Sequence, residues 1–205
     1  MNANDLKRLA PAADAASRSR RAAGELGSAA ADRGLLDVAV ATMDSPVGDL
    51  LIAVTPRGLA RVAFDIEPRD EVLEEIAERV SPRILASASG TDAWRHELEE
   101  YFAHDRTRFD LPIDRRLLSA FAWEVMSGAA RVPFGQTTTY GELADRIGHP
   151  RAARAVGTAL GSNPIPVVLP CHRVLRAGGK LGGYAGGLDR KTTLLEIEGA
   201  LPPRL

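Results

Sequence analysis

The chain of 205 residues has a single cysteine, few aromatic residues and no long apolar run. One cysteine excludes an intrachain disulfide framework and a zinc site built from several cysteines, which fits a reducing compartment. No apolar run approaches the roughly 20 residues that span a bilayer, and the first residues lack the apolar segment of a signal peptide. We therefore expect a cytoplasmic protein that uses no membrane and no metal.

The chain also has little net charge, but its charges are unevenly placed. A net charge of -1 argues against a protein that binds polyanions over its whole surface. Residues 1–119 carry 16 Lys and Arg against 21 Asp and Glu, whereas residues 120–205 carry 10 against 6. The basic surplus lies in the half that holds the cysteine. It permits a local nucleic-acid face, although a solvated surface would have the same composition.

Changes in composition divide the chain into three segments. Residues 1–36 are rich in Ala, Arg and Asp and predict one or two weak helices, with no indication of their role. Residues 37–113 alternate strand and turn signals before two helices, and residues 114–205 are mainly helical. We therefore expect an extension, a small sheet-plus-helix domain and a helical domain, an α/β (α+β) protein.

The middle segment predicts a small antiparallel sheet. Apolar runs separated by turn residues indicate strands, and the two stretches that follow have helical periodicity. In the second helix Trp94, Leu98, Tyr101 and Phe102 share one face at core spacing, so packing explains them better than a ligand would. The predicted strands cover residues 38–43, 50–55 and 59–64, and the predicted helices residues 70–80 and 92–102.

The last segment predicts a helix-turn-helix. A helix over residues 117–130 is followed by a break, and Thr139 with Glu142 forms a capping-box pattern that starts a helix over residues 140–147. A turn then leads to a helix over residues 151–161. Its face carries almost no side-chain bulk, which suits close approach to a narrow groove or tight packing on a neighbouring helix.

Cys171 stands in the run NPIPVVLPCHRV. A thiol next to a histidine and an arginine is typical of a nucleophile, whereas an isolated buried cysteine is as often an inert filler. Displacement at a saturated carbon needs a soft, strong nucleophile, and a thiol with an ordinary pKa of about 8.5 needs a base near it. His172 is the candidate base; on a strand its side chain would point away from Cys171, so a turn or a bridging water would be required.

Three stretches resemble a known family in order and spacing. VPFGQTTTYGELA, RAARAVGTALGSNPIPVVLPCHRV and LGGYAGGLDRKTTLLEIEG are similar to the DNA-binding and active-site segments of the O6-alkylguanine-DNA alkyltransferases, also called methylated-DNA-protein cysteine methyltransferases. A weaker likeness covers DSPVGDLLIAV, and residues 1–36 fall outside the pattern. The resemblance implies irreversible transfer of an alkyl group from guanine O6 in DNA to Cys171, with O4-alkylthymine as a further candidate substrate.

The resemblance also implies roles for individual residues. His172 would act on Cys171 through a water, Glu198 would orient His172, and Asn163 would shape the turn before the active-site segment. Tyr140 and Lys191 would assist at the base, while Arg154 would fill the gap left by a nucleotide flipped out through the minor groove. The other implied positions are the groove-facing Ala153, Ala155 and Gly157, and the base-pocket residues Tyr184, Gly186, Pro166 and Val174.

Two other classes of protein remain open from the residues alone. A Cys-His hydrolase would use the same pair of side chains but would need an oxyanion hole, which the sequence does not reveal. A non-catalytic sensor of alkylated DNA would not need the thiol. The alkyltransferase hypothesis implies no cofactor and a monomer bound to double-stranded DNA, with side-by-side binding along the DNA left open.

Overall fold

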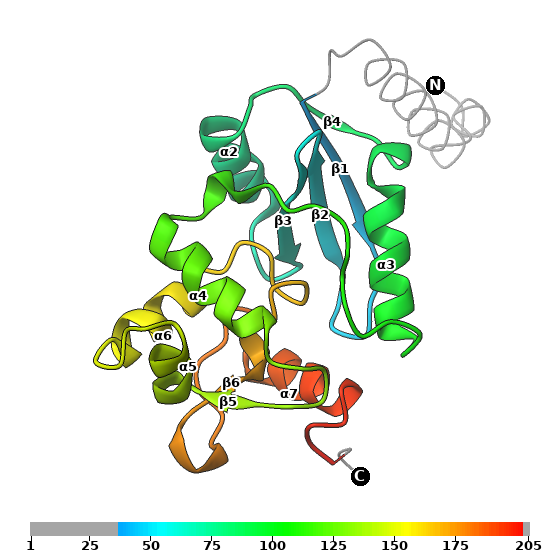
Figure 1. The fold of residues 1–205 in the computed structure, drawn as a ribbon. Helices are drawn as coiled ribbons and strands as arrows, with labels where there is room; N and C mark the ends of the chain where they lie inside the picture. The colour runs from blue at the N-terminus through cyan, green and yellow to red at the C-terminus, as the bar shows by residue number, and fades with distance from the viewer. Residues whose placement is uncertain (1–36, 203–205) are drawn as a thin grey trace, which may run out of the picture.

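The computed structural model describes residues 37–202, in which a sheet domain precedes a mainly helical one (Figure 1). This confirms the α/β class predicted from the sequence. The helices predicted within residues 1–36 lie outside the described residues. The sheet has the strand order β3-β2-β1-β4, with β1 at Val38–Met43, β2 at Leu50–Thr55, β3 at Gly58–Phe64 and β4 at Ile84–Ala86.

The edge of the sheet differs from the prediction. Strands β1, β2 and β3 pair antiparallel as expected, but β4 pairs with β1 in parallel, with Val38 opposite Ile84. Parallel neighbours need a long crossover, and helix α2 (Arg69–Arg79) supplies it between β3 and β4. The prediction of three antiparallel strands is therefore confirmed, but it omits β4, because a strand of three residues is too short to show a period of two.

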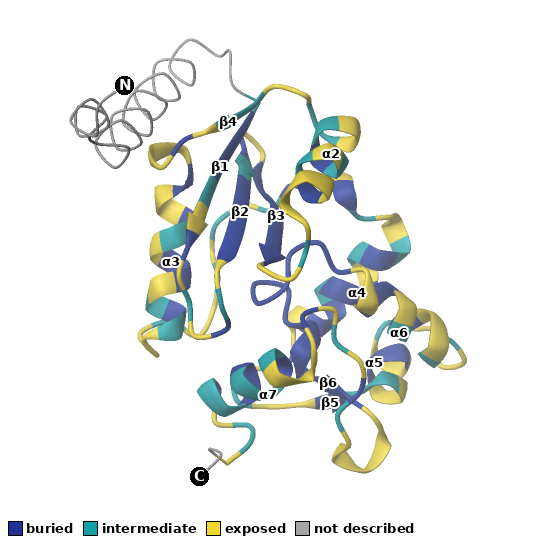
Figure 2. Cartoon of the chain, turned by 180° about the vertical axis from the view of Figure 1, so that it is seen from behind, coloured by how far each residue is buried: buried dark blue, intermediate teal, exposed yellow. Residues whose placement is uncertain are grey.

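Helices cover both faces of the sheet. Leu51 and Ala53 pack with Val72 and Ile76 of α2, whereas alternate residues of the same strand, including Leu50 and Ile52, face a second cluster. That cluster contains Trp94, Leu98 and Tyr101 of α3 (Asp92–Phe102), which confirms their assignment to packing. It continues into the helical domain, and Figure 2 shows buried residues along the strands and on parts of the helices.

The helical domain contains α4 (Ala120–Ala130), α5 (Tyr140–Arg146), α6 (Ala153–Gly161) and α7 (Leu188–Ile197). The predicted start of α4 at residue 117 is wrong, because the Ser119 side chain caps the helix by accepting the Ala122 N–H at 3.1 Å. Likewise, α6 begins at Ala153 and not at residue 151. The Thr139–Glu142 capping box is confirmed at the start of α5.

Short elements complete this domain and carry the segment around Cys171. The two-stranded sheet pairs β5 (Thr138–Thr139) in parallel with β6 (Val174–Leu175). Single turns of 3-10 helix lie at η2 (Ser89–Thr91), η3 (Arg115–Leu117), η4 (Cys171–Arg173) and η5 (Ala177–Gly179). Within residues 37–202, no helix has the length and apolar character needed to cross a membrane.

Direct hydrogen bonds join the two domains beside the active-site segment. The Val62 N–H of β3 donates to the Pro164 carbonyl at 2.9 Å, and Arg61 Nη1 donates to the same carbonyl at 3.2 Å. From the helical domain, Arg190 Nε donates to the Val47 carbonyl at 2.7 Å. The sheet domain therefore fixes the position of the turn that leads to Cys171.

Candidate functional site

Asn163 organises the segment that presents the thiol. Its Oδ1 accepts the Ile165 N–H at 3.0 Å, and its Nδ2 donates to the Leu169 carbonyl at 2.8 Å and to Cys171 Sγ at 3.1 Å. Asparagine commonly closes turns in this way, as the sequence predicts. The contact with sulfur goes beyond a turn, because a hydrogen-bond donor at this position favours the negatively charged thiolate.

The backbone of this segment is tightly constrained. Val167 has a φ of 73°, a left-handed conformation that is costly for a β-branched residue, and it is fully buried. Pro170 (φ -82°, ψ 63°) forms an inverse γ-turn in which the Cys171 N–H donates to the Leu169 carbonyl at 2.8 Å. Strained backbone of this kind persists where the surroundings hold it, so the segment presents Cys171 in a defined place.

Cys171 and His172 lie in a turn of 3-10 helix, η4, and not on a strand. The sequence requires either a turn or a bridging water between the two side chains. The structure has the turn, but among the described residues no hydrogen bond joins Cys171 Sγ to the imidazole, so a proton would still pass between them through a water. His172 is fully buried, and its Nδ1 has no hydrogen-bond partner among the described residues. Its Nε2 lies 2.8 Å from Glu198 Oε1.

Glu198, which caps the C-terminus of α7, is the centre of a buried hydrogen-bond cluster. Besides His172, it receives Arg173 Nε on Oε2 at 2.8 Å and Arg173 Nη2 on Oε1 at 2.9 Å. The Tyr101 hydroxyl of α3 donates to Oε1 at 2.7 Å, and the Gly135 N–H donates to Oε2 at 3.3 Å. The Glu198 carboxylate therefore accepts hydrogen bonds from the helical domain and also from Tyr101 of the sheet domain.

Arg173 and Tyr101 belong to this cluster although the sequence does not predict roles for them. Arg173 follows His172 directly, and its proximity to a histidine was a signal, but no pattern connects it with a glutamate 25 residues later. Tyr101 sits at a core position of α3, where periodicity explains its ring and says nothing about its hydroxyl. A buried phenol needs a partner, and that general rule was the only available hint.

Burial and charge shift the pKa values of these groups in different directions. Burial raises the pKa of Cys171 to about 11, although Asn163 and Lys191 oppose the rise. Burial lowers the pKa of His172, against the effect of Glu198. Burial would raise the pKa of Glu198, but hydrogen bonds from His172 and Arg173 outweigh it and hold the value at about 2. Near neutral pH the site therefore holds a thiol, a neutral imidazole and a carboxylate.

Because Glu198 is ionised, the hydrogen between it and His172 belongs to the imidazole. Neutral His172 is thus protonated at Nε2, which leaves the lone pair on Nδ1. This arrangement repeats the order of nucleophile, base and orienting carboxylate found in catalytic triads. Chemically, it can accept a proton from a nearby thiol.

Lys191 is buried in α7 and faces the same region. Its Nζ donates to the Val174 carbonyl of β6 at 2.7 Å. Burial lowers the pKa of Lys191 to about 8, and the charge of a Cys171 thiolate would raise it again. The lysine is therefore held beside the buried end of β6, where a proton or positive charge is available close to Cys171.

Tyr184 and Gly186 of the predicted base pocket lie together against the sheet domain. The Tyr184 ring stands 5.9 Å from that of Phe64, and its hydroxyl is buried without a hydrogen-bond partner in the described residues. A Cβ on Gly186 would approach Phe64 to 2.6 Å and Tyr184 to 2.9 Å. Glycine is thus required there by space. Pro166 and Val174, the other predicted pocket residues, are buried.

Tyr140 lies in the first turn of α5 and approaches both α6 and the segment after β6. A Cβ on Gly182 would meet its hydroxyl at 2.4 Å, so Gly182 is a spatial requirement that the sequence analysis did not identify. Burial raises the pKa of Tyr140, Arg176 lowers it, and Cys171 contributes a further rise. Tyr140 and Cys171 therefore interact electrostatically.

The small-residue helix α6 presents its first turns to solvent. Arg154 and Ala155 are exposed, and Ala153 and Gly157 are partly exposed, whereas Val156 packs into the core. A Cβ on Gly157 would sit 3.7 Å from the Tyr140 ring, an ordinary contact. Packing on Tyr140 therefore does not require a glycine at this position. Apart from Arg154, the outer face of α6 carries small side chains that are exposed or partly exposed to solvent.

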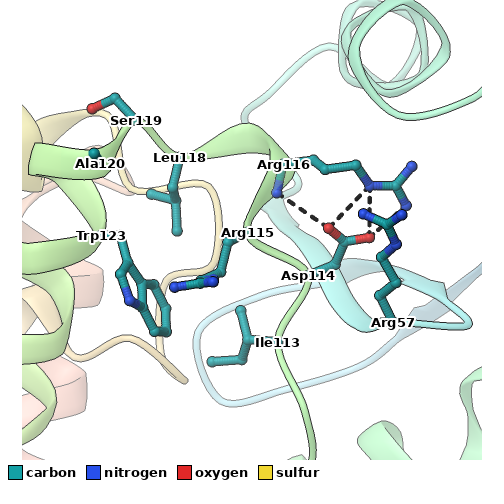
Figure 3. Close-up of a pocket in the computed structure, with 9 residues that line it drawn as sticks. All are labelled: Arg57, Ile113, Asp114, Arg115, Arg116, Leu118, Ser119, Ala120 and Trp123. Carbon is teal, nitrogen blue, oxygen red and sulfur yellow. Dashed lines mark hydrogen bonds and ion pairs between the residues drawn. The ribbon is translucent and has the colours of Figure 1, made fainter.

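A cavity of about 610 Å³ lies apart from these residues, next to the start of α4 (Figure 3). Asp114 accepts hydrogen bonds there from Arg116 Nε at 2.9 Å and from the Thr55 hydroxyl at 2.7 Å. The Arg115 guanidinium stacks 4.9 Å from the Trp123 ring centre. None of the site residues predicted from the sequence lines this cavity. Within residues 37–202, no group of three or more His, Cys, Asp or Glu side chains is placed to hold a metal ion.

Comparisons with known proteins cover both domains of the chain. Residues 120–200 match the family profile described as the DNA-binding domain of 6-O-methylguanine DNA methyltransferase, and residues 38–115 match that of its ribonuclease-like domain. The methylated-DNA–protein-cysteine methyltransferase of Mycobacterium tuberculosis is 41% identical over 162 residues, covering 79% of this chain and 93% of the relative. The inducible protein of that name from Bacillus subtilis is 34% identical over 148 residues, covering 72% and 82%.

Solved structures show the same fold. The crystal structure of Mycobacterium tuberculosis OGT in complex with DNA has a TM-score of 0.69 and 38% identity, covering 80% of this chain and 94% of that one. The O6-methylguanine-DNA methyltransferase of Pyrococcus kodakaraensis has a TM-score of 0.57 and 26% identity, covering 79% and 99%. The similarity therefore extends over both domains.

Proposed function

The chain belongs to the 6-O-methylguanine DNA methyltransferase family, and from that premise we propose that it repairs O6-alkylguanine in DNA by transferring the alkyl group to Cys171. The observation that carries this proposal is the buried chain of contacts from Asn163 to Cys171 and from His172 to Glu198. O4-alkylthymine also carries its alkyl group on an exocyclic oxygen and is a second candidate substrate.

The reaction begins with removal of the thiol proton. With a pKa of about 11, Cys171 is ionised in only about one molecule in 10⁴ at pH 7, so a base is needed. His172 Nδ1 is the base, and a water carries the proton to it from Sγ. Glu198 holds the imidazole in the tautomer that leaves Nδ1 free, and it stabilises the imidazolium.

The thiolate then attacks the alkyl carbon of the substrate. The S–C bond forms as the C–O6 bond breaks, and the electron pair of that bond stays on the guanine oxygen. The leaving guanine anion takes up one proton, so the proton that the thiol loses is balanced by the proton that the guanine gains. Lys191 and Tyr140, which lie close to Cys171, supply positive charge or a hydrogen bond to the departing base.

DNA handling belongs to the exposed side of the helical domain. The family DNA-binding profile covers α5 and α6, which form the proposed helix-turn-helix. The low surface of Ala153, Ala155 and Gly157 enters the minor groove, and Arg154 occupies the gap left when the damaged nucleotide rotates out. Base extrusion is required because a paired O6 atom lies inside the duplex, whereas Cys171 is buried in the protein.

The extruded base enters a pocket formed by Tyr184, Gly186, Pro166 and Val174. The Tyr184 ring offers a stacking surface, and the absence of a side chain on Gly186 lets Tyr184 and Phe64 pack closely against the backbone there. The protein acts as a monomer in the cytoplasm, with residues 37–113 and 114–205 as its two domains and residues 1–36 as an extension. Binding of molecules side by side along DNA stays open.

The two alternative classes have less support. A hydrolase would need preorganised donors for an oxyanion, whereas the Asn163 amide beside Cys171 donates to the sulfur itself and to the Leu169 carbonyl. A sensor that binds alkylated DNA without reacting would have no use for a thiol followed directly by a histidine that a buried carboxylate orients. The relatives that match over both domains carry the methyltransferase name.

Intact-mass spectrometry tests the proposal directly. After incubation with a duplex that contains O6-methylguanine, each protein molecule should gain one methyl group, about 14 Da, mapped to Cys171 by peptide sequencing. The Cys171→Ala variant is the matched control and should gain nothing. Repeated turnover, or methylation of another residue, would overturn the proposal.

A further inference from the structure

A side chain of the sheet domain contacts the carboxylate of Glu198, which together with Cys171 and His172 forms the proposed proton relay. Tyr101 lies in the last turn of α3, and its hydroxyl donates to Glu198 Oε1 at 2.7 Å across 97 residues of sequence. We infer that Tyr101 is a positioning residue for alkyl transfer, which sets the orientation and charge of Glu198 and, through it, the basicity of His172. This inference rests on the proposed function and adds to it a contribution from the other domain.

The donors around Glu198 make this coupling specific. Oε1 is shared by Tyr101, His172 and Arg173, whereas Oε2 receives Arg173 and the Gly135 N–H. Donors that share one oxygen compete for its negative charge, so the Tyr101 hydroxyl reduces the charge that His172 experiences. Arg173 binds both oxygens and fixes the plane of the carboxylate. Tyr101 is then the donor from the sheet domain that adjusts the negative charge on Oε1.

The hydroxyl of Tyr101 is not needed for packing. The ring lies among those of Phe102, Phe109 and Phe134, with centroid separations of 5.2, 5.3 and 5.8 Å, and phenylalanine would fill the same space. Burial first, and then the charge of Glu198, raises the pKa of Tyr101 well above its usual value, so the group stays protonated. It is therefore a permanent donor to the carboxylate.

The basicity of His172 depends on a small set of neighbours. The titratable and charged groups that face it from η4, α7 and α3 are Cys171, Arg173, Lys191, Glu198 and, through Glu198, Tyr101. Without the Tyr101 hydroxyl, more of the negative charge on Glu198 Oε1 acts on His172. Because this charge stabilises the imidazolium, the pKa of His172 should rise.

The experiment compares the pH dependence of single-turnover transfer in the wild type and in Tyr101→Phe, with methylated duplex and with free O6-benzylguanine. We expect the apparent pKa of the acidic limb to rise by roughly 0.5 to 1 unit with both substrates, and DNA affinity to stay unchanged. An unshifted acidic limb in a folded Tyr101→Phe protein would overturn the inference.

Two further variants separate positioning from packing. Trp94→Phe changes another buried ring on the same helix that contacts Phe109 but does not reach Glu198, and its profile should match the wild type. Tyr101→Phe in the Glu198→Gln background should cause no further shift, because the connecting carboxylate charge is absent. A shift with Trp94→Phe, or an undiminished shift without Glu198, would assign the effect to packing.

A third substitution preserves the shape of the side chain in case Tyr101→Phe does not fold. Site-specific 3-fluorotyrosine at position 101 is a stronger donor and should move the acidic limb in the opposite direction, to lower pH. No movement would refute the inference. A wild-type protein that takes up no methyl group would instead refute the proposed function itself, so the two failures are distinguishable.

Discussion

The buried relay around Glu198 and the exposed face of α6 perform different parts of the proposed reaction with opposite physical means. The relay is buried, and charge-assisted hydrogen bonds to one carboxylate fix its donors. The α6 face has almost no side-chain bulk, and Arg154 extends from it into solvent. One region depends on precise hydrogen bonds, and the other on shape and charge.

This contrast means that the two regions can be tested with different substrates. Chemistry at Cys171 is required whether the alkylated base arrives within a duplex or as a free molecule. Opening of the duplex is required only when the alkylated base arrives within DNA. A change in the relay should therefore affect both substrates equally, and a change on α6 should affect only the duplex.

The largest expected effect comes from Glu198→Gln. The amide cannot balance the charge of Arg173 or orient His172 as the carboxylate does, so transfer should slow by about 10²–10⁴ for duplex and free base alike. Single-turnover rates would measure the loss, while DNA affinity should stay close to that of the wild type. Equal rates in the variant and the wild type would remove Glu198 from the site.

The same substitution should also destabilise the fold. It leaves the Arg173 guanidinium buried without its counter-charge, which costs roughly 3–5 kcal/mol of unfolding free energy. The double variant Glu198→Gln with Arg173→Met is the matched control. It should recover part of the stability in urea denaturation without recovering the transfer rate.

Arg154→Ala should have a smaller and selective effect. Loss of the side chain that compensates for the extruded nucleotide should slow repair of duplex O6-methylguanine by about tenfold or more, a loss of ~1.4 kcal/mol. The rate with free O6-benzylguanine should change little, since no base is unstacked. A parallel fall in both rates and in the melting temperature would show that Arg154 supports the fold instead.

A further prediction concerns acid stability and again distinguishes the two regions. The pKa of Glu198 is lowered to about 2 from its usual 4.5, so its ionised form stabilises the folded protein above pH 4.5, and this contribution is lost as the pH falls toward 2. Urea denaturation between pH 6 and pH 3 should show a loss that is reduced in Glu198→Gln. Arg154→Ala should follow the wild-type curve, and a flat wild-type curve would contradict the expectation.

Local patterns in the sequence predicted much of the fold and the centre of the site. Apolar runs separated by turn residues located three strands, Thr139 with Glu142 marked the start of α5, and the run around Cys171 identified the thiol segment. These features depend on neighbours in sequence. The roles assigned to the individual site residues stay predictions until they are measured.

Contacts between distant segments could not be predicted in this way. Strand β4 is too short to show a period, and its partner β1 lies about 45 residues earlier. The hydrogen bond from Tyr101 to Glu198 spans 97 residues, and no local pattern specifies it. The 3-10 turn at Cys171 depends on Asn163 and on the strained backbone at Val167, which are set by packing.

The burial of Cys171 also determines how long each protein molecule remains usable. Thiol reagents and oxidants react with the thiolate, and a buried thiol with a pKa of about 11 offers almost none to a molecule met by chance in solution. A protein that can react only once gains from such inertness, because every accidental reaction would remove a molecule from the cell's reserve. Its single cysteine is therefore kept for an encounter in which the substrate itself enters the site.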